Sequence, residues 1–378
     1  MSLRDPVLVT GATGFIGGFL TAELLKRDAA VIALVRPRGE TSPLQRMRDL
    51  LRFFHMEFPG NLEVVEGSVD IPGLGLERGA AARVKSSAAT VLHCAASTSF
   101  AARKSGQLER VNVDGAANVL RAAGSSSRFC HMSTAYSAGI RSGVCREELT
   151  VQENFNNRYE QSKHRAELEV TELCRRAGKE LTIFRPTIVC GDSATGRSLR
   201  FTGLYYPVRM LLFLADSMRK DILEKDGTRA GKLGVSMDGC GRVNLPVVFP
   251  GDGHINILPV DHLTAAVLRI METGRPGIYH IVNPAPSTVG QVAEFIQACY
   301  RVSGIRVDGG GGTGPLQRLM DSYMELYYPY FCDGRVFDDA GAAAILEPAG
   351  IECPPLDLEL FRRCMDYAIE TGWNPRPG

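Results

Sequence analysis

The 378-residue sequence carries almost no net charge, because 43 lysines and arginines stand against 42 aspartates and glutamates. No overall electrostatic field would therefore draw the chain to nucleic acid or to an anionic membrane. Long apolar runs are also missing, and none approaches the roughly 18 residues of a membrane-spanning helix. The most apolar stretch, YYPVRMLLFLADSM from Tyr205, is interrupted by Arg209 and Asp216. These absences predict a soluble protein without an integral membrane segment or a nucleic-acid partner.

Paired cysteine motifs are absent as well. The ten cysteines include no Cys-x-x-Cys pair, and a chain of this length does not need a disulfide framework. We expect reduced thiols and no metal site. The first apolar run, Val7 to Thr10, begins too early and is too short for a signal peptide. The sequence therefore predicts a cytoplasmic protein.

Short β-branched runs alternate with longer helical patterns through the first half of the chain. Helical patterns cover residues 15–27, 43–54, 106–123 and 157–177. The expected strands are Val7 to Thr10, Val31 to Val35, Leu62 to Glu66, Thr90 to His93, Arg128 to Ser133 and Leu181 to Phe184. This order is typical of right-handed βαβ units. It predicts an α/β fold of the Rossmann type, a doubly wound parallel sheet with helices on both faces.

The alternation stops after Gly191. Residues 192–250 look irregular and are rich in glycine, arginine and aromatic residues, whereas residues 277–283 give one more strand and the region from Pro284 onward is mainly helical. We expect a nucleotide-binding domain from residues 1–190 with about 251–283. Residues 191–250 and 284–378 would form a smaller, mainly helical substrate-binding segment.

Three glycines follow the first expected strand in VTGATGFIGGFL, at Gly11, Gly14 and Gly17. In a βαβ unit the first glycine permits a tight turn, the second lets the backbone approach a pyrophosphate, and the third lets helix and strand pack closely. The N-terminus of the following helix offers unpaired N–H groups to the phosphates. The position of this motif, after a strand and before a helix, predicts dinucleotide binding.

Two arginines, Arg36 and Arg38, end the second expected strand, and no acidic residue precedes Glu40. An acid there would bind a free ribose diol, whereas an arginine accommodates a 2′-phosphate. The sequence therefore predicts NADPH as the cofactor in preference to NADH.

The helical pattern 157–177 contains Tyr159 and Lys163, which lie four residues apart and so share one face of a helix. A phenol near pKa 10 is a poor catalyst at neutral pH, but a nearby ammonium and an oxidised nicotinamide would lower its pKa. Ser133 and Thr134 end the preceding strand, and either hydroxyl would position a substrate carbonyl. Asn112 could hold a water that links the lysine to solvent.

These motifs occur together with VLHCAAS (91–97), VNVDGAANVL (111–120), STAY (133–136), YEQSK (159–163) and FRPTIVCG (184–191). In this order they resemble the extended short-chain dehydrogenase/reductases over about half of the chain. The resemblance makes Tyr159 the general acid, Lys163 the residue that lowers its pKa and binds the nicotinamide ribose, and Thr134 or Ser133 the carbonyl-polarising hydroxyl. Asn112 matches the family's structural asparagine. The resemblance also implies cofactor contacts from Thr13, Phe15, Ile16, Val69, Asp70, Cys94, Ala95, Ala96, Pro186, Thr187 and Ile188.

Further stretches favour one branch of that family. HMSTAYSAG (131–139), RPTIVCGDSATG (185–196) and INILPVDHL (255–263) resemble the thioester reductases and fatty acyl-CoA reductases, the male-sterility-like NAD-binding branch. This implies NADPH-dependent reduction of an acyl thioester, bound to CoA or to a carrier protein, to an aldehyde and in some members an alcohol. The apolar residues 204–218 would line an acyl site or simply pack the second domain.

Other interpretations stay open at this point. An extended family member acting on a ketone or alcohol, such as a hydroxysteroid, would use Tyr159 in the same way. A nucleotide-sugar epimerase or dehydratase shares the fold, and some relatives bind NADP without catalysis. A carrier-tethered substrate would arrive from an acyl carrier partner, and the sequence is compatible with a monomer or a dimer.

Overall fold

The structure is a computed structural model that describes residues 4–98, 106–251, 253–309 and 311–374. Its described part contains a seven-stranded sheet in the order β13-β7-β5-β4-β1-β2-β3, and every neighbouring pair runs parallel. The bounds of these strands are β1 Val7–Thr10, β2 Val31–Val35, β3 Leu62–Glu66, β4 Thr90–His93, β5 Arg128–Met132, β7 Glu180–Pro186 and β13 Gly277–Ile281. The predicted Rossmann-type sheet is confirmed.

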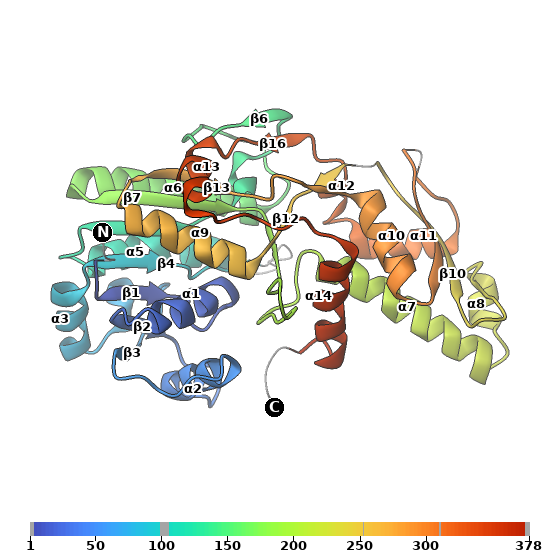
Figure 1. The fold of residues 1–378 in the computed structure, drawn as a ribbon, viewed down its shortest axis with the longest axis horizontal. Coiled ribbons are helices and arrows are strands. Elements are labelled where there is room, and N and C mark those ends of the chain that lie inside the picture. Colours follow the sequence, from blue (N-terminus) through green and yellow to red (C-terminus); the bar gives the residue numbers. More distant parts are fainter. Residues whose placement is uncertain (1–3, 99–105, 252, 310, 375–378) are drawn as a thin grey trace.

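Helices cover both faces of this sheet (Figure 1). Val7 and Val9 of β1 face one apolar cluster and Leu8 faces another, because successive residues of a strand point to opposite sides. Strands β1, β2, β4 and β5 are buried on both faces, as the interior of a parallel sheet requires. The helices of this region are α1 Phe15–Lys26, α2 Pro43–Phe53, α3 Arg78–Ser87, α5 Gly115–Ala122, α6 Arg158–Ala177, α9 Val260–Thr273 and α13 Ala340–Leu346.

A second lobe lies beside the carboxyl ends of the strands, on the right in Figure 1. It has its own apolar core, built around a three-stranded sheet in the order β15-β10-β9. Its elements are α7 Tyr205–Glu224, α8 Thr228–Lys232, β9 Ser236–Met237, β10 Val243–Phe249, α10 Val289–Cys299, β15 Val302–Val307, α11 Pro315–Met324, α12 Tyr328–Phe331 and α14 Leu358–Glu370.

Short pairs of strands connect distant parts of the chain. β8 Ile188–Cys190 pairs with β12 Ile257–Pro259, β11 His254–Ile255 with β14 Ser287–Thr288, and β6 Gly143–Cys145 with β16 Arg335–Phe337. The remaining short elements are η1 Pro72–Gly75, α4 Gln107–Glu109, η2 Arg110–Asp114, η3 Ala135–Ala138 and η4 Glu347–Ala349.

One expectation about the elements of the second lobe is wrong. Residues 192–250 are not irregular, because they contain the twenty-residue helix α7 and strand β10. One face of α7 is buried and includes Tyr205, Val208, Leu211 and Met218. Arg209 and Asp216, which interrupt the apolar run in the sequence, are exposed to solvent. The second lobe is mainly helical, as predicted, and also contains a small three-stranded sheet. No helix in the described residues is both long and apolar enough to cross a membrane.

The expected helix 106–123 is also broken. It consists of α4, the π-helical stretch η2 and α5. Asn112 lies inside the π-helical stretch, and such local widening occurs often at functional sites.

Candidate active site

The predicted site residues gather at the carboxyl edge of the seven-stranded sheet. Gly11 follows β1, Arg36 follows β2, Val69 and Asp70 lie on the loop after β3, and Cys94 to Ala96 follow β4. Ser133 and Thr134 follow β5, and Pro186 to Ile188 join β7 to β8. Ligands of open α/β sheets bind at this edge, where the strand order reverses.

The glycine turn has the geometry of a phosphate cradle. Gly11 has a φ of +69°, and a Cβ there would lie 2.7 Å from the Ala95 nitrogen. A Cβ on Gly17 would lie 2.3 Å from the Gly11 carbonyl oxygen. Gly14 is the N-cap of α1, so the free N–H groups of that helix begin at this turn. Phe15 and Ile16 start the helix, and the arrangement fits the pyrophosphate of a dinucleotide.

A third arginine joins the two predicted ones. Arg46 of α2 donates from Nη1 to the Arg36 carbonyl oxygen at 2.6 Å and from Nη2 to Thr13 Oγ1 at 2.6 Å. Arg36 and Arg38 are exposed beside it. Burial and then the charges of these two neighbours lower the pKa of Arg46. Three cations close together, with Thr13 at the glycine turn, fit an anionic group. No local pattern in the sequence marks Arg46, because it lies on a helix away from the strand end.

Helix α6 presents Tyr159 and Lys163 on one face. Asn157 caps its N-terminus by accepting a hydrogen bond from the Glu160 nitrogen at 3.0 Å, which places Tyr159 in the first turn. Lys163 is buried, donates to the Met132 carbonyl oxygen at 2.6 Å and lies 3.5 Å from His131 Nε2. Burial lowers the pKa of Lys163 to about 8.

The electrostatics of Tyr159 differ from the prediction. Burial and the neighbouring Glu160 raise the pKa of Tyr159 to about 12, and Arg200 acts to lower it. The predicted lowering of this pKa by Lys163 is thus not met in the protein itself. A raised pKa keeps the phenol protonated at neutral pH, which suits a proton donor. No motif in the sequence marks Arg200, which lies on the loop before α7.

The structure separates the two candidate hydroxyls. Ser133 donates from Oγ to Glu167 Oε1, which also accepts from Ser137 Oγ at 2.9 Å. Arg185 donates to the same carboxylate from Nη2 at 2.6 Å. Burial acts to raise the pKa of Glu167, but the charge of Arg185 and these hydrogen bonds outweigh it and lower the pKa. The Ser133 hydroxyl is therefore held in a buried ionic network.

Thr134 has weaker partners. Its Oγ1 donates to the Pro186 carbonyl oxygen at 3.3 Å and accepts from the Tyr136 nitrogen at 3.4 Å. Bonds of this length are near the limit of the interaction and are easily exchanged. Thr134 is therefore the better candidate to donate to a substrate carbonyl.

The Asn112 side chain is committed to the protein. Its Nδ2 donates to the Ser97 carbonyl oxygen at 3.0 Å and to Ser162 Oγ at 2.8 Å, and its Oδ1 accepts from the Ser97 nitrogen at 2.8 Å. Both amide hydrogens have protein acceptors, so Asn112 fixes the loop after β4 against α6. This fits its predicted structural role better than the predicted water link to Lys163.

A cavity of about 540 Å³ joins the nucleotide edge to the second lobe. Cofactor-side residues line one part of it: Gly14, Phe15, Ile16, Gly17, Cys94, Ala96, Ser133, Thr134, Tyr159, Lys163, Thr187 and Ile188. Burial raises the pKa of the Cys94 thiol to about 12, so it is no thiolate nucleophile. Gly11, Thr13, Arg36, Arg38, Val69, Asp70, Ala95, Asn112 and Pro186 are not among the lining residues.

The other part of the cavity is apolar. Helix α10 contributes Val289, Val292, Ala293 and Ile296, which recur at helical spacing, and α7 contributes Val208 and Leu211. The apolar stretch 204–218 therefore lines the cavity and also packs the core of the second lobe. Among the residues that the structure describes, no group of three or more His, Cys, Asp or Glu side chains is placed to hold a metal ion.

Several known proteins resemble this chain in sequence. The family described as male sterility protein, an NAD-binding family, matches residues 9–267. An isonitrile lipopeptide synthase of Streptomyces coeruleorubidus is 26% identical over 401 residues, which cover 99% of this chain and 25% of that protein. A carboxylic acid reductase of Mycobacterium tuberculosis is 26% identical over 369 residues, which cover 90% of this chain and 29% of that protein. The chain thus spans less than a third of either relative.

Solved structures share the fold. The terminal R domain from the myxalamid PKS-NRPS biosynthetic pathway superposes with a TM-score of 0.75 at 23% identity, over 100% of this chain and 93% of that one. UDP-glucuronic acid 4-epimerase from Bacillus cereus superposes with a TM-score of 0.62 at 15% identity, over 97% and 99%. Because the family match covers well over half of the sequence, the chain belongs to the male sterility protein family, an NAD-binding family.

Proposed function

We propose that the chain reduces an acyl thioester to an aldehyde with NADPH, and that Tyr159 is the general acid. The observation that carries the proposal is the cavity that joins Tyr159 and Thr134 to the apolar face of α10. Such a wall suits an acyl chain, whereas a nucleotide sugar would need charged partners for its pyrophosphate. The relatives named as a carboxylic acid reductase and as a lipopeptide synthase support acyl chemistry.

The side chains of the site fit this reaction. When bound, the reduced nicotinamide supplies a hydride to the thioester carbonyl carbon. Thr134 and Tyr159 would donate hydrogen bonds to the carbonyl oxygen, where negative charge develops. Tyr159, with a pKa of about 12, keeps its proton at neutral pH and transfers it to that oxygen. Breaking the C–S bond of the resulting hemithioacetal then gives the aldehyde and a free thiol. Lys163, held by the Met132 carbonyl oxygen, would bind the nicotinamide ribose.

NADPH is the proposed cofactor because of the arginines after β2. The Arg46 guanidinium contacts Thr13, and the charges of Arg36 and Arg38 lie close enough to lower the pKa of Arg46. Guanidinium groups match phosphate geometry. Replacing Arg36 and Arg38 together by alanine should lower kcat/KM with NADPH about 100-fold and leave kcat/KM with NADH nearly unchanged. An equal loss with both cofactors would contradict the assignment.

The substrate class is tested by a panel. We expect the purified chain to oxidise NADPH with acyl-CoA or carrier-bound acyl substrates and to release an aldehyde that a hydrazine reagent detects. A ketosteroid and a UDP-sugar serve as controls for the other members of the fold. Tyr159→Phe should lower kcat about 100- to 10,000-fold while NADPH still binds. Turnover of the ketosteroid alone, or full activity of Tyr159→Phe, would reject the proposal. A free aldehyde in the same panel tests the second reduction: NADPH oxidation with this substrate would show that the aldehyde is reduced to the alcohol.

A further inference from the structure

The first turn of α6 is held by a tyrosine from the second lobe. Tyr330 of α12 donates from its hydroxyl to Glu160 Oε1 at 2.7 Å and accepts from Asn157 Nδ2 at 2.7 Å. Asn157 is the N-cap of α6 and Glu160 is its third helical residue, so Tyr159 lies between the two residues that Tyr330 contacts. Tyr330 is separated from Glu160 by 170 residues of sequence.

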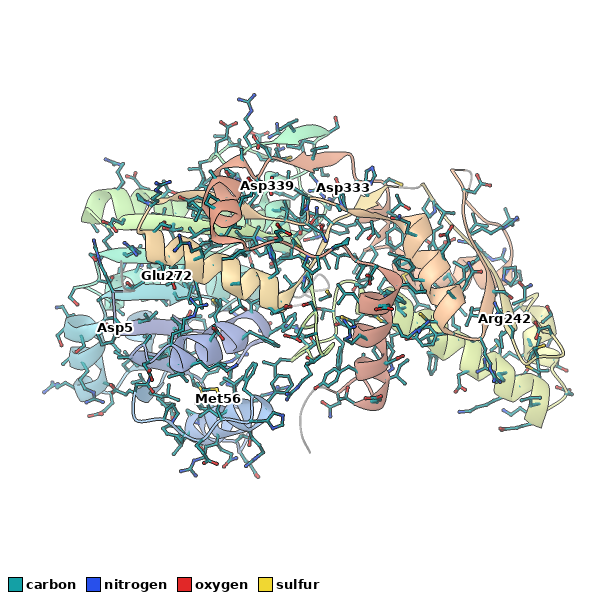
Figure 2. All side chains as sticks on the ribbon, in the orientation of Figure 1. Asp5, Met56, Arg242, Glu272, Asp333 and Asp339 are labelled. Carbon is teal, nitrogen blue, oxygen red and sulfur yellow. The ribbon has the colours of Figure 1, made fainter. Side chains whose placement is uncertain are left out.

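This contact is buried and charged. The Glu160 side chain has no solvent exposure, and its Oε2 accepts from the Asn156 nitrogen at 3.0 Å. Arg335 Nη1 lies 4.0 Å from Glu160 Oε1, and Arg335 forms an ion pair with Asp333 at 2.6 Å. Figure 2 labels Asp333 near the top of the view, above Glu272 of the sheet region and Arg242 of the second lobe. Because Glu160 belongs to α6 of the sheet region and Tyr330 to α12 of the second lobe, the network joins the two lobes.

Tyr330 also belongs to the wall of the catalytic cavity. It lines that cavity together with Tyr136 and Tyr159, and its ring meets the Tyr136 ring edge-on at 5.2 Å between centroids. The Arg335 guanidinium lies over the Tyr136 ring, 4.9 Å from its centroid. One side chain, Tyr330, thus contacts both the substrate space and the start of the helix that carries Tyr159.

We propose that Tyr330 is a positioning residue, which holds Tyr159 in place by binding Asn157 and Glu160 on either side of it. Helix ends fray because their first N–H groups have no partner within the helix, and Tyr159 lies in such a first turn. Small displacements of a reacting group lower the rate steeply. The second lobe thereby contributes to catalysis as well as enclosing the substrate. This inference rests on the proposed role of Tyr159 as the general acid.

The test is Tyr330→Phe, which keeps the ring in the cavity wall and removes the hydroxyl. Tyr323→Phe is the matched control, because Tyr323 lines the same cavity from α11. We expect hydrogen exchange of the amides at residues 158–161, followed by mass spectrometry, to be about 10-fold faster in Tyr330→Phe and unchanged in Tyr323→Phe. With an acyl-CoA substrate, kcat per NADPH-binding site should fall about 10- to 100-fold while KM changes little.

A second variant separates positioning from general loss of structure. Asn157→Ser keeps an N-cap oxygen but loses the donor to Tyr330. If Tyr330 acts through this contact, the double variant Asn157→Ser with Tyr330→Phe should be no slower than Tyr330→Phe alone. Unchanged exchange in Tyr330→Phe, equally fast exchange at residues 158–161 in Tyr323→Phe, or faster exchange with normal kcat in Tyr330→Phe would each overturn the proposal. If the wild-type chain reduces no acyl thioester, the proposed function is wrong. The hydrogen-exchange measurement still shows whether the Tyr330 hydroxyl stabilises the first turn of α6.

Discussion

Ser133 and Thr134 carry neighbouring hydroxyls that the sequence alone does not separate, and their replacement should have different effects. Glu167 is fully buried and accepts hydrogen bonds from Ser133, Ser137 and two nitrogens of Arg185. A hydrogen bond to a charged group contributes about 1.5–3 kcal/mol, and its loss leaves the buried carboxylate less satisfied. Ser133→Ala should therefore lower the free energy of unfolding by about 2 kcal/mol.

Thr134→Val should have the opposite profile. The two protein hydrogen bonds of Thr134 are 3.3 and 3.4 Å long, so their loss should cost less than about 1 kcal/mol of unfolding free energy. Loss of a donor to the developing oxyanion lowers kcat about 100- to 1,000-fold. We therefore expect Thr134→Val to be stable and slow, and Ser133→Ala to be less stable and nearly as fast as wild type.

Urea unfolding at neutral pH measures the first quantity, and initial rates of NADPH oxidation with an acyl-CoA measure the second. Rates are taken without urea and expressed per NADPH-binding site, so that unfolded protein does not count as slow protein. A stable but slow Ser133→Ala, beside a Thr134→Val that keeps its rate, would refute the assignment of the two hydroxyls. Equal loss of rate in both variants would show that the Glu167 network and the carbonyl site are one unit.

Burial underlies three further predictions. Burial lowers the pKa of Lys163 to about 8, so Lys163 loses its ammonium charge above that pH and kcat/KM should fall about tenfold per pH unit. Lys163→Arg should abolish this fall of kcat/KM at high pH. A wild-type kcat/KM that stays constant above pH 8 would contradict the role of Lys163. Burial lowers the pKa of His93 to about 3 and of His280 to about 4, so below pH 6.5 the unfolded chain binds protons that the folded one does not. The free energy of unfolding should then fall by about 1.4 kcal/mol per pH unit for each histidine as the pH drops towards 4. In His93→Asn, the free energy of unfolding measured with urea should depend less steeply on pH than in the wild type. Ala293→Phe would fill the apolar end of the cavity. Because a buried methylene contributes about 0.8 kcal/mol, kcat/KM should fall about fourfold for each carbon of the acyl chain that the new side chain excludes. If the variant kept the chain-length preference of the wild type, the acyl chain would bind elsewhere.

Local features were predicted correctly from sequence because their causes are local. The glycine turn, the alternation of strand and helix, and the start of α6 at Asn157 depend on backbone freedom, side-chain periodicity and capping within a few residues. Helix α7 is not predicted, because the glycine, arginine and aromatic content of residues 192–250 indicates irregular structure, although the apolar residues of the helix recur at helical spacing. Arg209 and Asp216 interrupt the apolar run without interrupting the helix. They lie on the solvent side, where charges do not oppose a helix.

The sequence by itself determined the type of sheet, the edge at which its loops meet, and the shared face of Tyr159 and Lys163, since strand order and helical periodicity dictate them. Tertiary structure decided which hydroxyl is held by Glu167, that Arg46 joins the arginines after β2, and that Tyr330 reaches the start of α6. These contacts join residues far apart in the chain, and no pattern within one segment encodes them. Burial, which shifts the pKa of Tyr159 upward and that of Lys163 downward, likewise exists only once the two lobes enclose the site.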